Sequence, residues 1–217
     1  MNIITYRRIN ILVLILISLI LLIAFYFQLF IDNVLPCALC NLQRAGFLLF
    51  GIGLIITLYS NDIRMGQLVC IASGILGGSV ALLHVLVELP PGMPSVGSSI
   101  FGVHMYGWVF IIFNILISYT AISAILFKQS SLCSIGINRS YTLKCVIALF
   151  GFICFANLFS VFLENGIKPM GFPQYHYWVI CKYQHKSDAE CSRPNLDDIL
   201  QEYKNNLKKL KSSWQNN

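Results

Sequence analysis

Cys37 and Cys40 are the residues of this sequence best suited to chemistry. They form a C-x-x-C motif that is followed by Arg44 and lies between two strongly apolar segments. Because so few residues separate the sulfurs, the pair can close into a small, reducible ring, which is typical of thiol–disulfide redox chemistry. Structural zinc is the alternative. A structural zinc site needs about four ligands, usually a second C-x-x-C or paired histidines, and the sequence contains no second C-x-x-C.

Arg44, His84, Glu88 and His104 are candidate ligands for a lipid-soluble quinone near this pair. A quinone needs a cation or a hydrogen-bond donor at its oxygens, and Arg44 follows Cys40 by one helical turn. His84 and Glu88 are spaced i, i+4 and share a helical face. Each has a simpler interpretation: Arg44 extends to lipid phosphates, His84 is a satisfied core residue, and His104 is a polar residue at the membrane interface.

Cys181 and Cys191 form a second possible pair in the polar C-terminal tail. One interpretation is a structural disulfide that stabilises the tail by roughly 2–3 kcal/mol in the loop-entropy model. The other is a second redox pair that exchanges with Cys37 and Cys40 and with a soluble protein thiol. The remaining cysteines are expected to be unreactive, as a free thiol or as apolar fillers within helices: Cys133, Cys70, Cys145 and Cys154.

The composition predicts an all-α integral membrane helix bundle. Of 217 residues, 57% are hydrophobic and 11% are charged, whereas soluble domains carry about 25% charge. Five apolar segments have about the length that a bilayer requires. They span about 11–31, 45–60 (starting at Asn41 or Leu42), 65–87, 103–127 and 145–163. No cleavable signal pattern is present, so the first segment is expected to be a retained anchor.

The basic residues predict the orientation. The net charge is +6, but it is spread over loops and tail, a pattern that concerns membrane orientation and not nucleic acid. With the N-terminus in the cytoplasm, Arg7, Arg8, Arg64 and the 128–144 loop all lie inside, as the positive-inside rule requires. Five crossings then place the C-x-x-C motif and the tail outside, in an oxidising compartment. A tail helix from Asn195 onward is expected to lie on lipid or on a partner.

Three pieces of the sequence resemble the disulfide-bond formation protein B (DsbB) family of the bacterial inner membrane. They are Pro36–Cys40 with Arg44, His84–Pro90 and Phe101–Trp108, and their order and spacing extend the resemblance over roughly residues 5–128. The resemblance implies a four-helix membrane core that oxidises a DsbA-like periplasmic thiol oxidoreductase and passes electrons to a quinone, either ubiquinone or menaquinone. It also implies that Cys37 and Cys40 are the quinone-linked pair, and that Arg44 and His84 line the quinone site.

The sequence departs from the family in its second outer loop, which is short and contains no cysteine. We expect Cys181 and Cys191 to replace the missing pair, because a fifth crossing places the tail on the same side. The expected parts are a DsbB-like core (1–128), a cytoplasmic loop (129–144), a fifth transmembrane helix (145–163) and a periplasmic tail (164–217). Two alternatives remain: a relative with a dedicated thiol partner, and a non-catalytic membrane scaffold with a structural disulfide.

Overall fold

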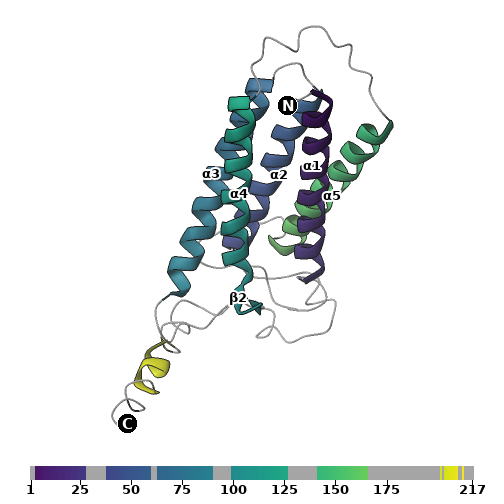
Figure 1. Cartoon of the computed structure of the whole chain (residues 1–217). Coiled ribbons are helices and arrows are strands. Elements are labelled where there is room, and N and C mark those ends of the chain that lie inside the picture. The colour runs from purple at the N-terminus through teal and green to yellow at the C-terminus, as the bar shows by residue number, and fades with distance from the viewer. Residues whose placement is uncertain are drawn as a thin grey trace.

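The protein is a bundle of long helices in a computed structural model that describes residues 3–27, 38–59, 63–89, 99–126, 141–165, 201, 203–209 and 212. The long helices are α1 (Ile3–Tyr26), α2 (Ala38–Tyr59), α3 (Ile63–Glu88), α4 (Met105–Leu126) and α5 (Tyr141–Asn165), with two short strands, β1 (Ser99–Ile100) and β2 (Val103–His104), before α4 (Figure 1). Within these ranges, five helices are long and apolar enough to cross a membrane. The expected all-α membrane bundle with a fifth crossing is confirmed.

Several predicted boundaries were wrong. α1 begins at Ile3 and not near residue 11, so Arg7 and Arg8 belong to the helix. α5 begins at Tyr141 and not at Cys145, and the Cys145 side chain is exposed, although we expected it to be buried. His104 does not open the fourth helix, because it ends β2.

A two-residue turn joins β1 to β2, and this hairpin was not predicted. Ser99 pairs with His104 and Ile100 with Val103. Phe101 and Gly102 make the turn with φ angles of 53° and 76°, because a tight hairpin turn of this kind requires positive φ at both central residues. The Trp108 Nε1 group donates a hydrogen bond to the Ile100 carbonyl oxygen at 3.0 Å. The hairpin is therefore fixed to the first turn of α4.

Glycines bring the backbones of α2 and α3 together. A Cβ atom added to Gly53 would lie 2.9 Å from the Gly66 carbonyl oxygen and 2.7 Å from Cys70 Sγ. Small residues allow this close approach, which compensates for the weak hydrophobic drive between helices in lipid. The α2–α3 contact is the most extensive of the bundle, followed by α3–α4, whereas α5 packs mainly on α1 and more narrowly on α2.

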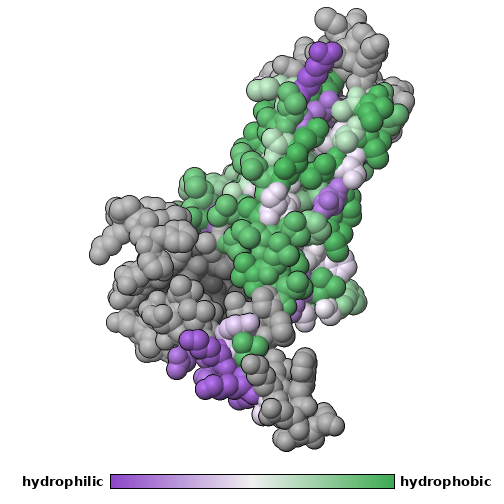
Figure 2. All heavy atoms as spheres, turned by 90° about the vertical axis from the view of Figure 1, so that its left-hand side faces the viewer, coloured by the Kyte–Doolittle hydropathy of each residue, from purple (hydrophilic) through white to green (hydrophobic). Residues whose placement is uncertain are grey.

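The outer surface of the bundle is apolar, as lipid contact requires. Figure 2 shows a broad hydrophobic surface along the helices, with polar groups gathered mainly towards the ends of the molecule. Exposed leucines and isoleucines occur on all five long helices. Inside the bundle, a polar cluster links three helices: Tyr119 donates to Asn10 Oδ1 at 3.1 Å, and the Gln67 amide donates to the Tyr6 hydroxyl at 3.3 Å.

Candidate functional site

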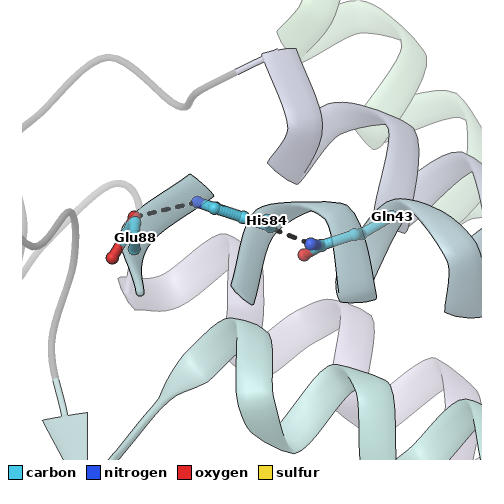
Figure 3. A network of polar contacts seen from close by, with 3 residues as sticks. All are labelled: Gln43, His84 and Glu88. Carbon is cyan, nitrogen blue, oxygen red and sulfur yellow. Dashed lines mark hydrogen bonds and ion pairs between the residues drawn. The ribbon is translucent and has the colours of Figure 1, made fainter. Parts of the chain in front are cut away.

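Gln43, His84 and Glu88 form a buried polar chain at the end of the bundle where α2 begins and α3 ends. The His84 Nε2 atom lies 3.1 Å from Glu88 Oε1, and the Gln43 Nε2 atom lies 3.3 Å from His84 Nδ1 (Figure 3). The side chains of His84 and Glu88 are only 5% and 7% exposed. The i, i+4 contact between them was predicted, whereas the contact with Gln43 was not.

The chemistry of the three groups fixes the direction of the hydrogen bonds. The amide nitrogen of Gln43 can only donate, so His84 Nδ1 accepts. A neutral imidazole then carries its proton on Nε2, and this N–H group donates a hydrogen bond to the Glu88 carboxylate. A carboxylate withdrawn from water inside a membrane needs such a partner, because an unpaired buried charge is costly. These three side chains therefore hold a proton between the His84 ring nitrogen and the Glu88 carboxylate.

Aromatic stacking connects His84 to the hairpin. The His84 and Tyr106 rings stack with centroids 4.6 Å apart, and the Tyr106 and His104 rings stack at 5.3 Å. Two of the predicted site residues, from α3 and β2, are thus brought to one place by Tyr106 of α4. His104 Nδ1 is buried and has no hydrogen-bond partner within the described part of the chain. A buried ring nitrogen of this kind is free to bind a polar group of a ligand.

Cys40 and Arg44 lie one helical turn apart on α2. Cys40 is in the first turn of the helix, which begins at Ala38, and takes part in a disulfide bond. The positive end of the helix favours a thiolate at this position when the disulfide is reduced. Arg44 reaches towards α1, where its Nη2 donates to the Ala24 carbonyl oxygen at 3.3 Å. Of the other cysteines that the structure describes, Cys70, Cys145 and Cys154 are free.

Gln43 and Arg44 direct their side chains to opposite neighbours of α2. Gln43 contacts α3 through His84, and Arg44 contacts α1 through Ala24. Both follow Cys40 by about one turn, and helical side chains lean towards the helix N-terminus. The turn of α2 that follows Cys40 therefore carries two polar groups that point in different directions, the Gln43 amide and the Arg44 guanidinium.

The structure describes only part of the predicted set. It brings His84, Glu88 and His104 together, and it places Cys40 and Arg44 on one turn of the adjacent α2. Cys37, Cys181 and Cys191 lie outside the described residues. The sequence analysis missed Gln43 and Tyr106. The available signals were a glutamine inside an apolar helix and a tyrosine two residues after His104.

Part of the chain matches a known protein family. The model of the family described as Disulfide bond formation protein DsbB matches residues 6–95. This range contains Cys37, Cys40, Arg44, His84 and Glu88, and it stops short of β1. The match is shorter than the resemblance seen in the sequence, and His104, α4 and α5 lie beyond it. No curated protein and no solved structure matches the chain.

Proposed function

Since residues 6–95 make this chain a member of the DsbB family, we propose that this multi-pass membrane oxidoreductase of disulfide bond formation reduces a quinone at the expense of a periplasmic dithiol protein. Cys37 and Cys40 are the pair that reacts. The bonded state of Cys40 supports this role, because the oxidised form is the one that accepts electrons from a thiol. The observation that carries the proposal is a disulfide-bonded cysteine within one helical turn of a cation, Arg44.

The net reaction is balanced by two electrons and two protons. A thiolate of the reduced partner attacks one sulfur of the Cys181–Cys191 disulfide and displaces the other sulfur as a thiolate. The second partner thiol then resolves the mixed disulfide, so that the partner leaves oxidised and Cys181 and Cys191 are left as a dithiol. The same exchange between this dithiol and the Cys37–Cys40 disulfide restores the tail disulfide and leaves the C-x-x-C pair as a dithiol. A quinone, ubiquinone or menaquinone, supplies the acceptor for the two electrons and two protons that restore the disulfide, and it leaves as quinol.

The polar side chains at this end of the bundle suit such an acceptor. Arg44 offers guanidinium donors to a carbonyl oxygen, and His104 Nδ1 is a buried polar atom with no partner among the described residues. His84 holds a proton next to the Glu88 carboxylate, which is the arrangement needed to supply or collect a proton locally. We therefore propose that Arg44, His84, Glu88 and His104 bind the quinone head and hold protons near it.

The proposal also includes the orientation of the protein in the membrane and the role of Cys181 and Cys191. We place the protein in a bacterial inner membrane, with the N-terminus on the cytoplasmic side and the C-x-x-C pair on the periplasmic side, following the positive-inside rule. Arg7, Arg8 and Arg64 lie at the opposite end of the bundle from Cys40, which agrees with this orientation. Cys181 and Cys191 then share a compartment with Cys40 and exchange disulfides with a DsbA-like partner.

Quinone-dependent reoxidation tests the function directly. The full-length protein is reduced in membrane vesicles without oxygen, decylubiquinone or menadione is added, and the free thiols are then counted by alkylation. We expect the wild type and the control variant Cys145→Ser to lose four thiols, two from each cysteine pair, because the two pairs exchange disulfides and Cys145 is exposed and free. Cys40→Ser is expected to lose none. A wild type whose thiols stay reduced with both quinones would instead indicate a membrane scaffold with a structural disulfide.

A further inference from the structure

The buried face of α5 changes from apolar to polar along its length. Six buried residues follow one another at helical spacing, in the order Leu143, Val146, Phe150, Ile153, Asn157 and Ser160. The first four belong to the apolar core, whereas Asn157 and Ser160 are polar and only 4% and 5% exposed. In a membrane helix, buried polar side chains are costly and commonly mark a functional surface. The polar half of this face lies towards the C-terminal end of α5.

This polar half lies at the depth of Arg44. Phe150 of α5 packs onto Gly51 of α2, since a Cβ atom on Gly51 would lie 2.2 Å from the Phe150 ring. The two helices run in opposite directions (Figure 1). From that contact, Arg44 and Asn157 are equally far along their helices towards the same end of the bundle, about 10 Å at the rise of an α-helix. Ala24 of α1, which binds Arg44, belongs to the same level.

The side-chain oxygen of Asn157, Oδ1, is an acceptor that has no hydrogen-bond donor among the described residues. Its Nδ2 donates to the Ile153 carbonyl oxygen at 2.9 Å, whereas its Oδ1 is buried without a hydrogen-bond partner among the residues that the structure describes. Nearly all buried polar atoms in proteins are paired, so an unpaired one calls for a ligand or a water. An amide oxygen accepts hydrogen bonds and cannot donate them. The missing group is therefore a donor.

We propose that α5 forms one wall of the redox site and that Asn157 Oδ1 accepts a hydrogen bond from a hydroxyl group of the bound quinol. This inference rests on the function proposed above and adds a residue beyond the family match. The oxidised quinone has only acceptor oxygens, so Oδ1 gains nothing from it, whereas each hydroxyl of the quinol can donate. Arg44 is the complement, because a guanidinium only donates. Asn157 thus selects the reduced product over the oxidised substrate.

Equilibrium binding of the two redox forms tests the inference without turnover. The full chain with Cys37→Ser and Cys40→Ser, which cannot exchange electrons, is titrated in detergent micelles with decylubiquinone and separately with decylubiquinol. Asn157→Leu is then added to this background. The matched control is Asn114→Leu, because Asn114 makes the same backbone bond, Nδ2 to the Phe110 carbonyl oxygen at 2.8 Å, but is exposed on α4.

We expect Asn157→Leu to weaken quinol binding roughly 3- to 10-fold, the value of one hydrogen bond, and to leave quinone binding within about twofold. Asn114→Leu should change neither. Equal losses for both redox forms, or no loss, would overturn the inference and leave the proposed function standing. Failure of the background protein to bind either form would overturn both. If the leucine variant does not keep its helical circular dichroism, the same comparison is made with Asn157→Ala.

Discussion

The contact between Gly51 and Phe150 joins α5 to α2, and a single methyl group tests it. In Gly51→Ala, the new Cβ would lie 2.2, 2.5 and 3.0 Å from three atoms of the Phe150 ring. Phe150 is 1% exposed, so its ring is enclosed by other atoms that a shift of the ring would have to displace. Overpacking of this kind costs about 1–3 kcal/mol. Alanine also favours the helix over glycine by up to about 1 kcal/mol, which opposes the loss.

Gly151 provides the control that separates the two effects. It follows Phe150 in α5, and an added Cβ would have no atom within 4 Å. Gly151→Ala should therefore give only the gain in helix propensity. The difference in unfolding free energy between the two variants then equals the overpacking cost, about 1–3 kcal/mol. A double variant, Gly51→Ala with Phe150→Leu, removes the colliding ring atoms and should recover part of the loss.

Unfolding by titration with sodium dodecyl sulfate in mixed micelles, followed by circular dichroism, measures these differences. A second readout is the rate at which Cys154 of α5, which is half-buried, reacts with a maleimide. We expect faster labelling in Gly51→Ala than in Gly151→Ala. Equal stability and equal labelling in the two alanine variants would refute the packing of α5 on α2, and the depth argument for Asn157 would fail with it.

Two further predictions concern the hairpin before α4 and the two cysteines of the C-terminal tail. Phe101→Asn should slow amide hydrogen exchange in the hairpin about fivefold, because asparagine tolerates the positive φ of 53° and a bulky aromatic does not; unchanged exchange would contradict a strained turn. Replacing both Cys181 and Cys191 by serine should abolish oxidation of a DsbA-like partner while decylubiquinone still reoxidises Cys37 and Cys40, measured by alkylation of each protein. Full partner oxidation would reduce the tail pair to a structural staple.

The number of crossings could be predicted from the sequence because hydropathy alone determines which segments enter a bilayer. The helix ends could not. Arg7 and Arg8 interrupt the apolar pattern, yet α1 continues through them, because the backbone stays hydrogen-bonded into the headgroup region and arginine side chains extend to water. The start of α5 at Tyr141 has the same explanation, since Lys144 lies in its first turn.

The candidate site was predictable where its contacts are local. The pairing of His84 with Glu88 follows from i, i+4 spacing on one helix. Gln43 contacts His84 across 41 positions of sequence, and that contact depends on how α2 and α3 are rotated about their axes. The stack of His104 on Tyr106 depends on a hairpin whose turn contains a phenylalanine at positive φ. Phenylalanine is atypical of such a turn, so the hairpin could not be predicted from the sequence.

Because α2 lies between α3 and α1, the polar groups on its two sides have different chemical roles near Cys40. On one side, Gln43 leads to a histidine and a carboxylate, groups that hold and exchange protons. On the other, Arg44 provides fixed positive charge at the level of the polar half of α5. Reoxidation of a dithiol requires groups that take up protons and groups that stabilise negative charge. Neither side of α2 alone contains both kinds of group. The fifth helix therefore adds to the side of α2 that the proton-holding chain does not reach.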